Sequence, residues 1–168
     1  LKDAGRDVIA VGKIFDIFDG EGVTEKIKTT GNTNGIAFTK ALQTRDFEGL
    51  AFVNLVDFDM LYGHRRDVAG YAAAATEFDK FVADFIPGMR EGDILMVTAD
   101  HGCDPSYTKT TDHTREYVPY LICGKGVKPG VDLGTRLCFG TIAQTICDYL
   151  GVDASTLDGQ SVLSDILK

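Results

Sequence analysis

The chain has 168 residues, of which 44% are hydrophobic and 25% charged, and its formal net charge is −8 at pH 7. This length suits one domain, or the larger part of one, with a buried core. The acidic balance disfavours nucleic acid and anionic membranes as partners, and no apolar stretch is long enough to cross a bilayer. With no signal-peptide pattern at its start, we expect a cytoplasmic protein.

Four short apolar runs predict buried strands. Each is rich in Val, Ile, Leu or Phe with little polar alternation, which is typical of parallel strands covered on both faces. In chain order the runs are Asp7–Gly12, Leu50–Phe58, Asp93–Ala99 and Val118–Gly124.

Helical patterns lie between and after these runs, at Asn34–Leu42, Val68–Phe85 and Thr141–Leu150. The second is the most regular, with apolar side chains at steps of three or four residues. Strands that alternate with helices predict an α/β fold in which a mostly parallel sheet is flanked by helices. The segment Gly102–Glu116 reads as a loop that is long for a compact domain, and such loops often carry function.

The four cysteines include no C-x-x-C pair. We expect buried free thiols in a reducing compartment. They are Cys103, Cys123, Cys138 and Cys147.

The chain has only three histidines, and each has an aspartate nearby. His64 follows Asp59 after the second predicted strand, and His101 follows Asp100 directly after the third. His113 lies at the far end of the long loop, next to another aspartate. Because open α/β sheets bind ligands at the carboxyl ends of their strands, these side chains are candidates for one site.

Imidazole and carboxylate groups together suit Zn²⁺, Mn²⁺ or Fe²⁺, and a mixed set fits Mn²⁺ well. A single His beside an Asp is commonly a hydrogen-bonded pair, but three such motifs that use every histidine favour metal ions. Asp100 and His101 are neighbours and point apart, so they could serve one ion or two. Two ions about 3.5–4 Å apart form the usual clamp for phosphoryl transfer.

Three motifs resemble the metal motifs of the alkaline phosphatase superfamily: Asp59-x-x-x-x-His64, TADHG at 98–102 and TDHTRE at 111–116. Longer stretches resemble, within that superfamily, the phosphopentomutase family, and the similarity runs over nearly the whole chain. These stretches are GKIFDIFDGEGVT at 12–24, NLVDFDMLYGHRRD at 54–67 and DHTREYVP at 112–119.

The resemblance implies an alkaline phosphatase-like core with two Mn²⁺ ions. It makes Asp59, His64 and His113 the ligands of one ion, and Asp100 and His101 ligands of the other.

Other residues have two interpretations each. Lys13 matches a lysine that reaches the phosphosugar in the family, although it could be a solvated surface lysine. Asp57 is a candidate hydrogen-bond partner for a metal-bound imidazole. Arg65 and Arg66 are interpreted as structural ion-pair partners of nearby aspartates.

The family interconverts ribose 1-phosphate and ribose 5-phosphate, and their 2-deoxy counterparts, through a phosphorylated threonine. The strand with its remaining metal aspartate, the nucleophilic threonine and the inserted cap domain have no match here, and Thr24, Thr29 and Thr30 lie in the wrong context. The resemblance therefore implies that residues 1–168 are the C-terminal segment of a metal-binding catalytic core. We expect this segment to need the rest of the polypeptide and to be inactive alone, with the nucleophile upstream of Leu1.

Two other functions stay open. One is another superfamily enzyme, such as a relative of cofactor-independent phosphoglycerate mutase or a phosphodiesterase. The other is a non-catalytic metal-binding or assembly domain. The sequence does not distinguish ribose from deoxyribose, fix the metal, or give an oligomeric state.

Overall fold

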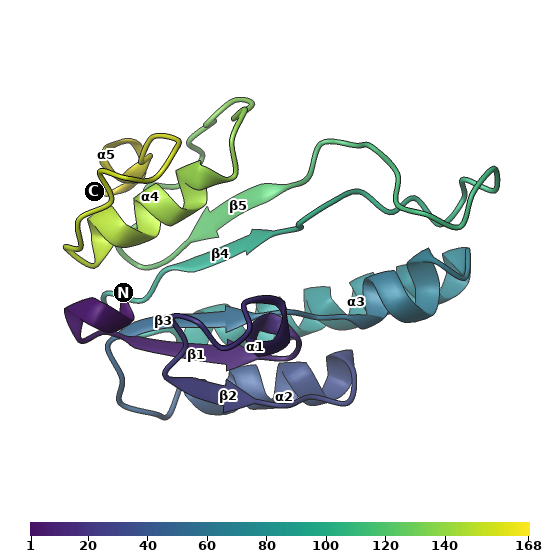
Figure 1. The fold of residues 1–168 in the computed structure, drawn as a ribbon, viewed down its shortest axis with the longest axis horizontal. Coiled ribbons are helices and arrows are strands. Elements are labelled where there is room, and N and C mark those ends of the chain that lie inside the picture. Colours follow the sequence, from purple (N-terminus) through teal and green to yellow (C-terminus); the bar gives the residue numbers. More distant parts are fainter.

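The computed structural model describes residues 1–168 and contains two separate β-sheets (Figure 1). Strands β1 (Asp7–Val11), β2 (Glu25–Ile27) and β3 (Gly49–Val53) form a parallel sheet in the order β2-β1-β3. Strands β4 (Leu95–Thr98) and β5 (Tyr120–Cys123) form an antiparallel pair.

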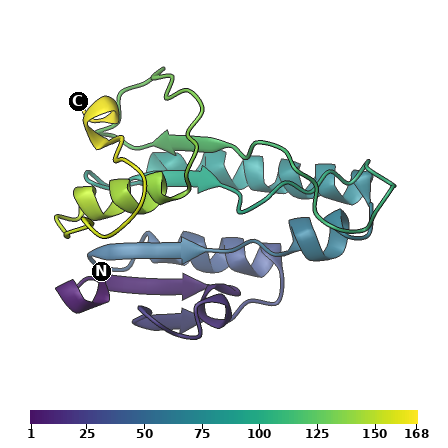
Figure 2. The same cartoon turned by 45° about the horizontal axis from the view of Figure 1, so that its top comes forward.

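The helices flank these sheets. In Figure 1, α2 and α3 lie behind the parallel sheet, and α1 lies in front of it. Helices α4 and α5 lie beside the β4–β5 pair. Figure 2 shows the same arrangement from a second angle. Their bounds are α1 Ile14–Ile17, α2 Asn32–Leu42, α3 Val68–Phe85, α4 Gly140–Tyr149 and α5 Leu163–Ile166. Two 3₁₀ turns, Lys2–Ala4 and Ile86–Gly88, and a π-helical turn, Phe58–Gly63, complete the set.

Two small hydrophobic clusters hold the structure together. The first joins the parallel sheet to α2 through Ile9, Val11 and Leu42. The second joins the β4–β5 pair to the C-terminal segment through Val127, Val162 and Ile166. Val127 lies in the segment between β5 and α4. The two clusters share no residue, and 18 of the 168 residues are buried, so each half has its own modest core.

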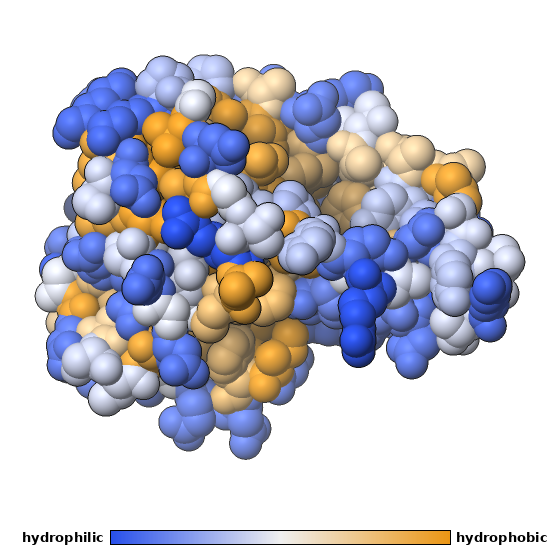
Figure 3. Space-filling model, turned by 90° about the horizontal axis from the view of Figure 1, so that it is seen from above, coloured by the Kyte–Doolittle hydropathy of each residue, from blue (hydrophilic) through white to orange (hydrophobic).

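Apolar side chains remain on the surface of the second half. Leu121 in β5 and Leu137 and Phe139 before α4 are exposed. Figure 3, seen from above, shows apolar surface in several places on that face, and the first half also exposes Ile17 and Phe18. A two-stranded sheet with such a surface is only marginally stable. No helix of the structure is both long and apolar enough to span a membrane.

The predicted α/β architecture, with a parallel sheet flanked by helices, is confirmed. One strand direction differs from the prediction: β5 runs antiparallel to β4, because the long loop between them returns the chain to the end where it began. The second predicted strand also ends early, at Val53, and the residues before Phe58 lead into the π-turn. The short elements β2, α1 and α5 have no periodic signal and were not predicted.

The cysteines are free, as predicted, but none of them is buried. Cys138 is exposed, because it lies in the irregular segment before α4 rather than on the apolar side of that helix.

Candidate metal centre

The π-turn Phe58–Gly63 explains how Asp59 and His64 come to face one point. Five residues of an α-helix turn the chain by about 500°, which would put the two side chains about 140° apart. A π-helix advances about 80° per residue, so residues five apart lie only about 40° apart around the axis. The N–H of His64 donates to the carbonyl of Asp59 at 2.9 Å, which is the i→i+5 bond of that geometry.

All three histidines meet beside Asp59. The Nε2 atoms of His64 and His113 lie 3.2 and 3.3 Å from Oδ1 of Asp59. His101 stacks on His113, with ring centroids 3.6 Å apart, and His64 lies 4.9 Å from His113. Asp59, His101 and His113 each have one potential ligand atom that lies within 4.8 Å of those of the other two.

Oδ1 of Asp59 is buried and has no hydrogen-bond partner in the structure. The two imidazole nitrogens near it are close but not aligned for hydrogen bonds. Ligand atoms that share an ion at about 2.1 Å stand about 3.0–3.4 Å apart, which matches the distances from Asp59 to His64 and His113. A buried carboxylate oxygen without a partner is costly, and a cation would remove that cost. The donor set therefore fits a divalent metal ion.

His64 is oriented by a backbone group. Its Nδ1 lies 2.5 Å from the carbonyl oxygen of Thr111, in the long loop. Because a carbonyl only accepts hydrogen bonds, Nδ1 is the donor in this contact, and Nε2 is the ring nitrogen that faces Asp59. No local sequence pattern indicates this contact, because it joins residues 47 positions apart.

Asp100 is the most exposed of the five predicted metal residues. Its side chain is 76% exposed, and its carboxylate lies 3.7 Å from Nε2 of His101. The structure thus brings Asp59, His64, His101 and His113 into one cluster and leaves Asp100 at its rim. His101 and His113 also line a groove of 750 Å³ that Asp100 borders, with the basic side chains Arg115 and Arg136 in its wall.

Arg66 holds the long loop against the π-turn. Its guanidinium donates to the backbone carbonyls of Gly63, Asp104, Thr110 and Asp112. Its backbone has a φ of 55°, in the left-handed region that costs a non-glycine residue about 1 kcal/mol. The prediction of a structural role fits, but the predicted ion pairs with aspartates are wrong: Arg66 binds carbonyl groups, and Arg65 is exposed without an ion pair.

Asp57 does not support a histidine. Its Oδ2 accepts from the N–H of Asn32 at 2.6 Å, and its own N–H donates to the Asn32 side chain at 2.9 Å. This reciprocal pair anchors the start of α2. The predicted hydrogen bond from Asp57 to an imidazole is therefore wrong, since the carboxylate is engaged at the helix N-terminus.

Cys103 lies beside the cluster, packed against Gly63. Burial, and next the negative charge of Asp59, raises the pKa of its thiol. The raised pKa disfavours the thiolate form of this side chain.

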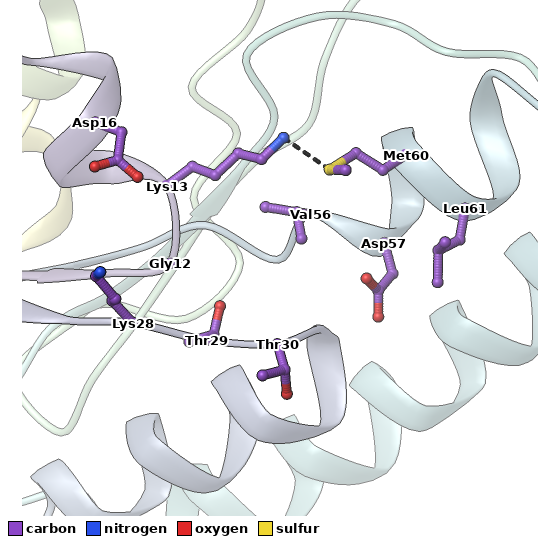
Figure 4. A pocket seen from close by; sticks show the side chains of 10 residues that line it. All are labelled: Gly12, Lys13, Asp16, Lys28, Thr29, Thr30, Val56, Asp57, Met60 and Leu61. Carbon is purple, nitrogen blue, oxygen red and sulfur yellow. Dashed lines mark hydrogen bonds between the residues drawn. The ribbon is translucent and has the colours of Figure 1, made fainter.

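Lys13 lies on the other side of the π-turn, in a second pocket of 390 Å³. It follows β1, and its Nζ donates to Sδ of Met60, the neighbour of Asp59, at 2.7 Å (Figure 4). The lining residues are Gly12, Lys13, Asp16, Lys28, Thr29, Thr30, Val56, Asp57, Met60 and Leu61. A lysine paired only with a thioether keeps its capacity to bind an anion, because sulfur is a weak acceptor.

Comparison with protein families places residues 2–154 in the family described as the metalloenzyme superfamily. A phosphopentomutase of Acetivibrio thermocellus is 53% identical to the chain over 163 residues, which is 97% of this chain and 42% of the relative. A phosphopentomutase of Lachnoclostridium phytofermentans is 53% identical over all 168 residues, or 43% of its own length. One of Symbiobacterium thermophilum is 51% identical over the same span, or 42% of its length. The chain thus spans less than half the length of these relatives.

Proposed function

The chain belongs to the metalloenzyme superfamily, and from this premise we propose that it forms the metal-binding part of a phosphopentomutase. The complete enzyme would interconvert ribose 1-phosphate and ribose 5-phosphate, or the 2-deoxy sugars, through a phosphothreonine and a bisphosphate intermediate. The observation that carries the proposal is the buried, unpartnered Oδ1 of Asp59 among the histidines. The names of relatives that are about half identical over nearly the whole chain support the substrate class.

Asp59, His64 and His113 are proposed to bind one metal ion, and Asp100 and His101 to contribute to a second. Manganese is the proposed metal, because a mixed carboxylate and imidazole set suits it. Bound divalent ions would lower the pKa of a hydroxyl nucleophile and offset charge on the transferring phosphoryl group. His101 stacks on His113 at 3.6 Å, and one ligand atom of each lies with one of Asp59 within 4.8 Å, so the two proposed ion positions would be close together.

The protein's own groups would orient this site. The Thr111 carbonyl fixes the ring of His64, and Arg66 holds the loop that carries both Thr111 and His113. Lys13 is proposed to bind the phosphosugar, and the free cysteines are in keeping with a reducing compartment such as the cytoplasm. The 168 residues alone are proposed to lack mutase activity, since no threonine among them stands in the context of the nucleophile.

The test is ribose 5-phosphate conversion by the full-length polypeptide with Mn²⁺. We expect ribose 1-phosphate as product, and His64→Ala is expected to lower kcat by at least a hundredfold. Lys80→Ala, on the exposed side of α3, is the control and should leave the rate unchanged. A His64→Ala enzyme with near-normal activity would overturn the metal-ligand role. An inactive parent that still binds Mn²⁺ would instead favour a non-catalytic metal-binding domain.

A further inference from the structure

The pocket beside Lys13 contains a second basic side chain with no assigned role. Lys28 follows β2, and Lys13 follows β1, so the parallel pairing of these strands brings both lysines to one edge of the sheet. Thr29 also lines the pocket, and Figure 4 shows its hydroxyl pointing up into the space between them. Neither Lys28 nor the Thr29 hydroxyl has a hydrogen-bond or ion-pair partner in the structure.

The carboxylates that line this pocket are engaged elsewhere. Asp16 is paired with Lys26 at 2.5 Å, and Asp57 accepts from the N–H of Asn32. Lys26 lies outside the lining and pairs with Asp16, so three ammonium groups stand near two carboxylates, although the charge of Lys28 also acts on Asp16. The two ammonium groups left without carboxylate partners, Lys13 and Lys28, give the pocket a local preference for an anion in a chain whose overall charge is −8.

We infer that Lys28 and Thr29 bind, together with Lys13, the phosphate group of a phosphorylated sugar. Two ammonium groups and a hydroxyl arranged around one space suit a tetrahedral phosphate, which accepts hydrogen bonds from several directions. The pocket, at 390 Å³, lies within the range of small-molecule sites.

The position of the pocket suggests a role for this subsite in the mutase reaction. This part of the inference rests on the proposed function. Met60 in the pocket wall is the residue next to Asp59, so the π-turn separates the pocket from the histidine cluster. A mutase that moves phosphate between two positions of one sugar must hold the end that is not reacting. Lys28 would hold that end while the cluster acts on the other.

The test measures binding to the full-length polypeptide after chelation of metal, so that the histidine cluster does not contribute. Inorganic phosphate and ribose 5-phosphate are titrated separately, by calorimetry, into the wild type and three variants. Lys28→Met should weaken binding of ribose 5-phosphate at least fivefold, and Thr29→Val about two- to threefold. The control Lys40→Met removes the same charge from α2, outside the pocket, and should change affinity less than twofold. A parallel loss for inorganic phosphate would assign the contact to the phosphate rather than the sugar.

The inference fails if Lys28→Met binds like Lys40→Met, or if neither ligand binds saturably to the wild type. With metal restored, Lys28→Met should raise KM for ribose 5-phosphate at least fivefold and leave kcat within about twofold. A polypeptide that binds phosphate through Lys28 but does not interconvert the sugars would refute the proposed function and leave this subsite standing. Normal mutase activity with an unchanged KM in Lys28→Met would support the proposed function and refute the subsite.

Discussion

Single atoms decide much of this site, and Oδ1 of Asp59 is the clearest case. It is buried, unpartnered, and within 3.3 Å of two imidazole nitrogens. A buried carboxylate oxygen without a hydrogen-bond partner is unfavourable, and a cation bound between it and the imidazole nitrogens would remove that cost. We therefore expect this residue to destabilise the protein when no metal ion is bound.

Asp59→Asn should therefore raise the thermal stability of the metal-free chain while removing its response to metal. An amide N–H₂ in place of Oδ1 can donate to a ring nitrogen of His64 or His113. We expect the Tm in chelator to rise by about 1–3 °C. The rise in Tm that Mn²⁺ produces in the wild type should disappear.

Asp46→Asn is the control, since that side chain is fully exposed, and it should preserve the Mn²⁺ response. A lower Tm for Asp59→Asn in chelator would contradict the cost assigned to the oxygen.

Gly12 is needed by the backbone at the end of β1. Its φ is 83°, and a Cβ added there would lie 2.6 Å from the carbonyl oxygen of Asn54. Gly12→Ala should destabilise the chain by about 3 kcal/mol, from the left-handed backbone and the clash together. Gly22 has a similar φ of 71° but open space around it, so Gly22→Ala should cost only about 1 kcal/mol. Urea unfolding measures both values, and equal losses would show that the clash is relieved by movement.

At the scale of elements, the long loop depends on one side chain. Arg66 donates to four carbonyl groups, and three of them belong to the loop between β4 and β5. The loop in turn carries Thr111 and His113. A change at Arg66 should therefore reach the histidine cluster without removing any ligand.

Arg66→Lys keeps the charge but cannot reach several carbonyl groups at once. We expect it to weaken Mn²⁺ binding about 10- to 100-fold, the range typical for groups that support ligands. Arg65→Lys is the matched control at the neighbouring, exposed position and should bind Mn²⁺ normally. Titration calorimetry compares the two, and equal affinities would remove Arg66 from the support of the site.

The link between β2 and the end of α2 predicts a pH effect. Arg45 donates to both carboxylate oxygens of Glu25, and this hydrogen bonding lowers the pKa of Glu25 below its ordinary 4.5. Because the folded pKa is lower than the unfolded one, the pair stabilises the fold above the unfolded pKa, and this contribution is lost as pH falls through the folded pKa.

Arg45→Gln should lower Tm slightly at pH 7, because both side chains are substantially exposed. The difference from the wild type should shrink below pH 4.5 and vanish in stronger acid. Thermal unfolding at several pH values measures it, and a pH-independent difference would mean that packing, rather than charge, is responsible.

The elements that sequence predicted well are those with long periodic patterns. The helix Val68–Phe85 has the predicted bounds, and β1 and β4 lie inside their apolar runs. The residues of the cluster were also predicted, because histidines are few and follow strand ends. The antiparallel direction of β5 and the contacts of Asp57 and Arg66 depend on where the loops fold back, which local pattern does not encode.

At the scale of the whole molecule, the two hydrophobic clusters divide the chain into halves of unequal stability. The first surrounds a three-stranded sheet whose central strand is almost fully buried. The second cluster supports only two strands. Leu121, which lies in one of them, β5, is 63% exposed to solvent. Such a half opens more easily than a sheet with a covered centre.

Hydrogen exchange on the chain should show this difference. Backbone amides of β1 and β3 should exchange at least tenfold more slowly than those of β4 and β5, because the first ladder is better covered. Mass-spectrometric or NMR exchange resolves the two ladders within one sample. Equal protection would mean that the halves open as one unit despite their separate cores.

The π-turn also sets a rule for moving this site to another scaffold. An aspartate and a histidine separated by four residues converge because the turn between them is wide. On a regular α-helix the same pair converges when two or three residues lie between them. A graft onto an ordinary helix would therefore have to delete one or two residues between Asp59 and His64, and a graft that copied the spacing unchanged would send the two ligands to different sides.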